Sequence, residues 1–265
     1  MAENILTVEN LNIAYQGVPA VMDVNFTLER GKVLTIVGES GSGKTTVIRA
    51  LMGLLPVGGE VTDGTMIFNG QDLRTLSKSE WRAIRGKDMA MIFQDSGSAL
   101  DPIVRIGKQF RELYKSHIEI DNDECDRRAI ELLESVSLPN GADILRRYPH
   151  ELSGGQRQRV GIAMALAMDP ALLIGDEPTS ALDVTTQSQV VMQMLELAKE
   201  HNSAIVMVTH NLGVAAYISD YIIVMKKGRV VDAGTPQDIL EKPSNEYTKQ
   251  LKDAVPTLGG GRYID

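Results

Sequence analysis

The chain has 265 residues and a formal net charge of −8 at pH 7, from 27 Lys and Arg against 35 Asp and Glu. This acidity disfavours binding along a nucleic-acid backbone, and we expect no nucleic-acid partner. The hydrophobic fraction of 43% excludes a wholly disordered chain. The single cysteine, Cys125, excludes a disulfide scaffold. Because Cys125 lies among acidic residues, we interpret it as an incidental surface thiol.

The first part of the chain shows the short alternating or apolar runs that are typical of β-strands. Strands are predicted at 5–8, 11–15 and 24–28, and an almost continuous apolar run at 32–37 predicts a strand buried on both faces. A helix is predicted at 44–55. Gly58, Gly59 and Gly64 predict a loop, and after it we expect a strand at 65–68, a short helix at 77–84 and a strand at 89–93.

Residues 96–152 show no strand pattern and predict a helical insertion, with helices at 106–116 and 123–137. Beyond it, helices are predicted at 156–168 and 185–201, and strands at 171–174 and 204–209. A hairpin is predicted from strands at 221–226 and 229–233. Because strands alternate with helices, the sequence predicts an α/β fold with a largely parallel sheet.

No stretch of ~20 mostly apolar residues is present that could span a membrane. No Lys or Arg precedes Arg30, so the beginning of the chain lacks the basic segment of a secretory signal. We therefore expect the protein to stay in the cytoplasm unless a partner holds it at a membrane.

A glycine-rich loop follows the predicted strand at 32–37 and matches the pattern G-x-x-x-x-G-K-[ST]. Its residues are Gly38, Glu39, Ser40, Gly41, Ser42, Gly43, Lys44 and Thr45, and the adjacent Thr46 belongs to the same predicted nucleotide-binding set. Glycines allow successive backbone N–H groups to turn toward one anion, and the following helix points its positive end there. Lys44 can reach the β- and γ-phosphates, and the Thr45 hydroxyl can bind Mg²⁺. The alternative is a Gly-Ser surface turn with a chance Lys-Thr, which the apolar strand before the loop and the helix after it disfavour.

Two carboxylates follow the buried strand predicted at 171–174. In open α/β sheets the carboxyl ends of the strands face the ligand. Asp176 can hold Mg²⁺ through water, and Glu177 can accept a proton from the attacking water. In isolation the pair is better explained as a solvated strand end; beside a phosphate loop it predicts a hydrolysis site.

A third pattern, Leu152 followed by Ser153, Gly154, Gly155 and Gln156, stands at the start of a predicted helix. Exposed backbone N–H groups and a hydroxyl at a helix N-terminus form a ready anion site. The plainer explanation is an ordinary serine cap.

Together these residues resemble the ATP-binding cassette (ABC) ATPases, over most of the chain from about Val8 to about Pro256. Residues 152–156 are similar to the family's signature sequence. The resemblance implies that Tyr15 stacks on adenine, that Gln94 senses Mg²⁺ and the γ-phosphate, and that His210 contacts the γ-phosphate. It also implies that 180–183 form a loop that crosses to a partner subunit. Taken singly, Tyr15, Gln94 and His210 are explained equally well as packed or strand-end residues.

A narrower resemblance is to the oligopeptide, dipeptide and nickel importer ATPases. The residues that carry it are 93–95, 100–102, 106–107, 148–151, 183–185, 246–248 and 254–256. This resemblance implies a P-loop fold with a mostly parallel sheet core, an N-terminal antiparallel β subdomain and a helical insertion. The expected ABC ATPase domain is 1–258, with a catalytic core at about 1–94 and 153–258, a helical subdomain at about 95–152, and a flexible tail at 259–265.

The same resemblance implies an ATPase subunit of an importer that uses ATP and Mg²⁺ to drive solute uptake, most readily of an oligopeptide or dipeptide. The implied partners are a second and different ATPase subunit, two transmembrane permease subunits and an extracytoplasmic solute-binding protein, at the cytoplasmic face of the cell membrane. Three alternatives stay open: an importer of nickel or a metallophore, a soluble ABC ATPase without transport, and a regulatory nucleotide-binding module without turnover.

Overall fold

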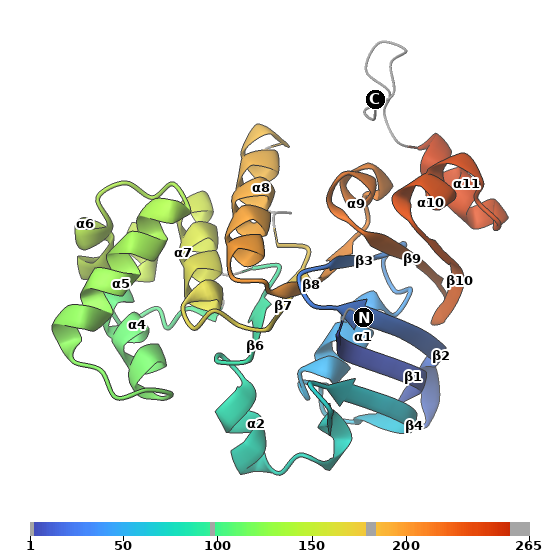
Figure 1. The fold of residues 1–265 in the computed structure, drawn as a ribbon, viewed down its shortest axis with the longest axis horizontal. Helices are drawn as coiled ribbons and strands as arrows, with labels where there is room; N and C mark the ends of the chain where they lie inside the picture. Colours follow the sequence, from blue (N-terminus) through green and yellow to red (C-terminus); the bar gives the residue numbers. More distant parts are fainter. Residues whose placement is uncertain (1–2, 96–98, 179–183, 255–265) are drawn as a thin grey trace. The chain divides into compact units, whose positions relative to one another are not determined.

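The described residues of this computed structural model are 3–95, 99–178 and 184–254. They fall in two compact units, one within Met1–Ser77 and Ala204–Asp265 and the other within Lys78–Ser203 (Figure 1). The predicted crossing loop at 180–183 and the predicted tail at 259–265 lie outside the described residues. Among the described residues no helix is long and apolar enough to cross a membrane.

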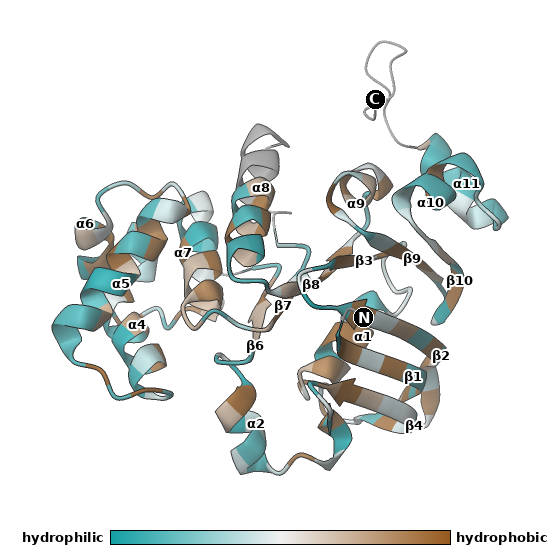
Figure 2. Cartoon of the chain, in the orientation of Figure 1, coloured by the Kyte–Doolittle hydropathy of each residue, from teal (hydrophilic) through white to brown (hydrophobic). Residues whose placement is uncertain are grey.

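The first unit contains an antiparallel sheet with the strand order β2-β1-β4-β5. Its strands are β1 (Asn4–Tyr15), β2 (Val18–Glu29), β4 (Gly59–Phe68) and β5 (Gln71–Asp72). Hydrophobic and polar residues alternate along the second half of β2 (Figure 2), as expected for a strand with one buried face. The two short strands predicted at 5–8 and 11–15 form one long strand, β1, which a bulge interrupts between Val8 and Leu11.

Strand β4 corrects the loop predicted around Gly58 and Gly64. The strand begins at Gly59 and continues through Gly64, which has a φ of +95°. A Cβ on Gly64 would lie 2.4 Å from the backbone oxygen of Asn10, which itself has a φ of 50° in the bulge of β1. Glycine is thus needed where two irregular strands approach closely, and a local reading of the sequence mistakes it for a turn.

A second sheet in the first unit has the order β10-β9-β3-β8. Strand β3 (Val33–Val37) is parallel to β8 (Ala204–Thr209) and β9 (Tyr221–Lys226), and β9 forms the predicted hairpin with β10 (Arg229–Gly234). The 3-10 turn η1 (Leu73–Thr75) also belongs to this unit.

Helix α1 (Lys44–Leu51) is shorter than predicted, because Gly53 ends it. Gly53 has a φ of 59° and donates to the Ala50 carbonyl at 2.9 Å, and Leu54 donates to the Arg49 carbonyl at 2.8 Å. This pair of hydrogen bonds is the Schellman ending of a helix. Three short helices were not predicted: α9 (Leu212–Ile218), α10 (Pro236–Glu241) and α11 (Glu246–Asp253).

The second unit is mostly helical. Its helices are α2 (Lys78–Ile84), α4 (Ile106–Lys115), α5 (Asn122–Ser135), α6 (Gly141–Arg146), α7 (Gly154–Leu166) and α8 (Val184–Glu200), with the 3-10 turn η2 (Pro149–Glu151). Strands β6 (Met89–Ile92) and β7 (Leu172–Asp176) pair in parallel. Among the described residues of 96–152 there is no strand, as predicted, although the short α6 was missed.

Cys125 is buried, so its interpretation as a surface thiol was wrong. It lies on α5 in line with Ala129 and Leu133, four residues apart, and all three face the core. Burial raises the pKa of the thiol. The acidic neighbours point elsewhere because successive residues of a helix project about 100° apart.

Tyr114 on α4 is fully buried, and its hydroxyl has no hydrogen-bond partner among the described residues. Burial raises the pKa of this hydroxyl to about 12. The unfolded phenol ionises near pH ~10, so between pH ~10 and ~12 the unfolded state loses a proton that the folded state keeps. Raising the pH through this window therefore favours unfolding.

Between pH ~10 and ~12 the free energy of unfolding of wild type should fall as the pH rises. In Tyr114→Phe we expect this fall to be about 2 kcal/mol smaller. At pH 7 the variant should be as stable as wild type or more stable, because no hydrogen bond is removed. Urea unfolding at several pH values measures both. An equal alkaline loss in the two proteins would contradict this account of Tyr114.

Candidate functional site

The glycine-rich loop joins the end of β3 to the start of α1, where the sequence placed it. Gly38 is glycine for lack of space, since a Cβ there would lie 2.2 Å from the backbone oxygen of Met225 on β9. Gly41 and Gly43 have φ angles of +79° and +102°, which L-residues with side chains rarely adopt. The close approach and the two angles together bend the chain into a compact loop.

Lys44 is enclosed by this loop, with only 5% of its surface exposed. Its Nζ donates to the carbonyl oxygens of Gly38 and Glu39, at 2.8 Å each. A buried ammonium group needs such partners, because an unpaired buried charge is strongly destabilising. The cation is therefore held at a defined place inside the loop.

Ser42 supplies a second indication of an anion site. Its hydroxyl is buried and has no partner among the described residues. The Ser42 amide donates to the Glu39 carbonyl at 3.2 Å, and the Ser42 carbonyl accepts from the Gly228 amide at 3.0 Å, so the loop is tied to the β9–β10 turn. A buried cation beside an unpartnered hydroxyl, at the N-terminus of a helix, fits the phosphates of a nucleotide.

The first unit contains four more of the predicted site residues, two in α1 and two at the ends of strands. Thr45 and Thr46 are partly buried in the first turn of α1, and the half-buried Tyr15 ends β1. Val37 pairs with Thr209 in the parallel β3–β8 register, so the loop and the exposed His210 leave the same edge of the sheet. The structure therefore brings His210 to the phosphate-loop edge.

In the second unit the predicted carboxylates and Gln94 also share one edge. Ile92 of β6 pairs with Gly175 of β7, so three predicted residues lie at the carboxyl ends of adjacent strands. Gln94 lies two residues beyond β6, Asp176 is the last residue of β7, and Glu177 follows it. Asp176 is 5% exposed. Glu177 has a φ of 46°, an unfavourable backbone conformation for a residue with a side chain, and such strain concentrates at functional positions.

The signature residues form the start of α7. The Ser153 hydroxyl accepts from the Gln156 amide at 3.3 Å, and the Gln156 side chain accepts from the Ser153 amide at 2.9 Å. This reciprocal pair is a capping box, so in this structure Ser153 acts as a helix cap. Gly154 is exposed and Gly155 half-buried, which leaves the first turn of α7 accessible.

Among the described residues no three His, Cys, Asp or Glu side chains come together as a metal site. Proteins bind Mg²⁺ through one or two oxygen groups together with substrate phosphates and water. Thr45 in the first unit, and Gln94 and Asp176 in the second, provide oxygen groups of that kind.

One residue of the loop's surroundings was missed as a functional candidate. The hydroxyl of Tyr247, on α11, accepts a hydrogen bond from the Glu39 amide at 2.9 Å. No local signal connects the two positions, because 208 residues separate them along the chain.

A buried lysine in a glycine-rich loop between a parallel strand and a helix defines a P-loop nucleotide-binding protein. The chain belongs to the ABC transporter family, whose model matches residues 21–180. This confirms the family and fold class that the sequence predicted, and the chain is an ATP-hydrolysing cassette of the transporter type.

Relatives match almost the whole chain. A dipeptide transport ATP-binding protein, DppD, of Lactococcus lactis subsp. cremoris is 45% identical over 261 residues, which are 97% of this chain and 75% of that protein. An oligopeptide transport ATP-binding protein, OppD, of Haemophilus influenzae is 45% identical over 260 residues, 97% of this chain and 80% of the relative. A solved dimeric ATP-binding cassette, bound to ADP and Pi after hydrolysis, is similar with a TM-score of 0.76 and 28% identity, over 87% of this chain and 98% of that one.

We expect Gly38→Ala to weaken ATP binding roughly tenfold or more, because its Cβ would push the loop away from β9 and displace Lys44. Titration with a fluorescent nucleotide measures this. Gly70→Ala is the matched control: Gly70 has a φ of +81° and open space around it, so the substitution strains the backbone without a clash. ATP affinity equal to wild type in Gly38→Ala would contradict the packing argument.

Proposed function

We propose that this protein binds Mg-ATP at the phosphate loop and uses its hydrolysis to drive uptake of short peptides. The observation that carries the nucleotide site is the Lys44 ammonium held inside the glycine loop by the carbonyls of Gly38 and Glu39. The peptide as solute is supported by the relatives, which are dipeptide and oligopeptide transport ATP-binding proteins. The residues of the narrower resemblance, such as 246–248, support the same class.

The proposed roles follow from residue chemistry. Lys44 and the amides of 41–46 bind the phosphates, and Tyr15 stacks on the adenine. Thr45, Gln94 and Asp176 hold Mg²⁺, partly through water, and the ion supplies charge neutralisation at the phosphates. Glu177 accepts a proton from the water that attacks the γ-phosphorus as the bond to ADP breaks, and His210 donates a hydrogen bond to the γ-phosphate.

The first turn of α7 has a different proposed role. Ser153, Gly154, Gly155 and Gln156 bind the γ-phosphate of the nucleotide held by a second ATPase subunit, which we propose to be a different chain. ATP then joins two subunits, because its charge is attracted to two positive helix ends. The dimeric state of the similar cassette bound to ADP and Pi supports this arrangement.

The remaining proposals concern assembly. The chain works at the cytoplasmic face of the cell membrane with two permease subunits and an extracytoplasmic solute-binding protein. The helical subdomain, about 95–152, carries the face that meets the permease subunits, and the catalytic core is made of about 1–94 and 153–258. The helices α4, α5 and α6 fall within that subdomain.

Purification of the tagged chain from membranes, without cross-linking, tests the transport role. We expect two permease subunits and a second ATPase chain to co-purify, and the assembled complex to take up labelled di- or oligopeptides in vesicles. A chain that purifies without membrane proteins would favour the soluble ABC ATPase instead. Uptake of nickel chelates but not of peptides would favour the metal-importer alternative.

We expect Glu177→Gln to keep ATP affinity within about threefold and to lose ~10²–10⁴ in hydrolysis rate at its own site, because an amide fills the same space but takes no proton. ATP binding and single-turnover hydrolysis in the assembled complex measure the two effects. Lys44→Ala is the contrasting variant, since it should lose binding itself. Hydrolysis near the wild-type rate in Glu177→Gln would exclude Glu177 as the base.

A further inference from the structure

We infer that Tyr247 is a positioning residue for the phosphate loop, which through its hydroxyl sets the place of the Lys44 ammonium. This inference rests on the proposed nucleotide site. It assigns a function in that site to the helix α11 (Glu246–Asp253), whose Tyr247 lies 208 residues beyond Glu39 in the sequence. The argument depends on one peptide group, on the packing of one aromatic ring and on the way α11 begins.

The peptide group that links Gly38 to Glu39 is held from both sides. Its N–H, on Glu39, donates to the Tyr247 hydroxyl at 2.9 Å, and its C=O, on Gly38, accepts from Lys44 Nζ at 2.8 Å. A trans peptide is planar, and its N–H and C=O point in opposite directions. Fixing the N–H on the Tyr247 side therefore fixes the carbonyl that holds Lys44 on the other side.

The Tyr247 ring cannot easily move away from this contact. Tyr247 is 7% exposed and belongs to a buried cluster with Val37, Leu212 and Val224. The Lys226 ammonium lies 4.3 Å from the ring centroid, in the geometry of a cation–π interaction. Burial raises the pKa of the Tyr247 hydroxyl, so the group stays neutral and keeps its ordinary hydrogen-bonding capacity.

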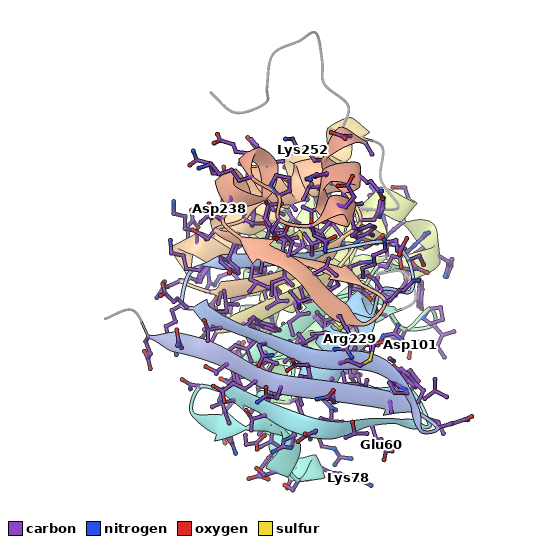
Figure 3. All side chains as sticks on the ribbon, turned by 90° about the vertical axis from the view of Figure 1, so that its right-hand side faces the viewer. Glu60, Lys78, Asp101, Arg229, Asp238 and Lys252 are labelled. Carbon is purple, nitrogen blue, oxygen red and sulfur yellow. The ribbon has the colours of Figure 1, made fainter. Side chains whose placement is uncertain are left out.

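The start of α11 is tied to β10 by the carboxylate of Asp232. This group accepts from the Ser244 hydroxyl at 2.8 Å, the Ser244 amide at 3.0 Å and the Asn245 amide at 3.3 Å. Burial alone would raise the pKa of Asp232, but the hydrogen bonds from the Ser244 hydroxyl and from the Ser244 and Asn245 amides outweigh it and lower the pKa. Figure 3 shows α11, marked by Lys252, close to the hairpin strand β10, which begins at the labelled Arg229.

Asn245 then begins the helix, since its side chain accepts from the Tyr247 amide at 2.9 Å. The ionised Asp232 thus fixes the start of α11, α11 carries Tyr247, and Tyr247 holds the peptide that positions Lys44. The carbonyls of Gly38 and Glu39 hold the Lys44 ammonium where it can meet a phosphate. Loss of the Tyr247 hydroxyl should therefore weaken ground-state and transition-state binding of the phosphates alike.

The test is Tyr247→Phe in the full chain and in the assembled complex, because phenylalanine keeps the ring packing and removes only the hydroxyl. We expect the dissociation constant and the KM for Mg-ATP to rise about three- to tenfold, the effect of one lost hydrogen bond. The kcat should change less than about twofold, and the Tm of the nucleotide-free protein less than about 4 °C. The binding constant is measured on the full chain and the kinetics on the complex.

Tyr114→Phe is the matched control, since it removes a buried tyrosine hydroxyl that has no partner among the described residues. It should leave the KM for Mg-ATP unchanged. Hydrogen exchange of the Glu39 amide is a second measurement: nucleotide-free wild type should protect it ~10-fold more than Tyr247→Phe does. If Tyr247→Phe folds poorly, rapid exchange at Glu39 in the wild type itself would overturn the inference.

The outcomes separate this inference from the proposed site. Unchanged ATP affinity in Tyr247→Phe, with binding lost in Lys44→Ala, would overturn the role of Tyr247 and leave the nucleotide site standing. A lower Tm and kcat with an unchanged KM would show a merely structural role and would also overturn it. Normal ATP binding by Lys44→Ala would overturn the proposed nucleotide site, and the inference with it.

Discussion

The enclosure of the Lys44 ammonium is the interaction on which the proposed nucleotide site depends. A nearly buried positive charge is tolerated only where hydrogen-bond acceptors replace water, and the carbonyls of Gly38 and Glu39 do so at 2.8 Å. Turning these carbonyls inward requires the tight loop, which in turn requires glycine at Gly38, Gly41 and Gly43. The helix α1 then begins at the lysine, with its positive end at the proposed phosphate site.

Strand register places the other residues of the proposed site. Parallel strands end at the same edge of a sheet, so residues that follow paired strand ends lie together whatever their separation in the chain. In the first unit the β3–β8 register brings His210 to the edge from which the phosphate loop leaves. In the second unit the β6–β7 register does the same for Gln94 and the carboxylates of Asp176 and Glu177.

The helices α9, α10 and α11 pack in the first unit against the residue that precedes the loop. The helices α9, α10 and α11 bury Leu212, Ile239 and Tyr247 in the cluster that contains Val37, the residue that immediately precedes the loop. A core of this kind transmits displacement, because protein interiors are close-packed and compress little. The end of β3 and the first peptide of the loop therefore share their packing with α11.

Much of this protein could be predicted from its sequence, because the decisive signals are local. The apolar run at 32–37, the glycine loop ending in Lys44 and Thr45, and the two carboxylates after a buried strand each need only a few adjacent residues. Such patterns follow from strand and helix periodicity and from the backbone freedom of glycine. They were sufficient for the fold class and the family.

Only the tertiary structure could decide what depends on distant neighbours. Gly64 sits within a strand because β1 bulges against it, and Cys125 is buried because three residues of α5 share one face. The bond from the Glu39 amide to the Tyr247 hydroxyl joins positions 208 residues apart. A local pattern states what a segment can do by itself, whereas these features arise from the surfaces that meet when the chain is folded, and no short window of sequence contains both sides of such a contact.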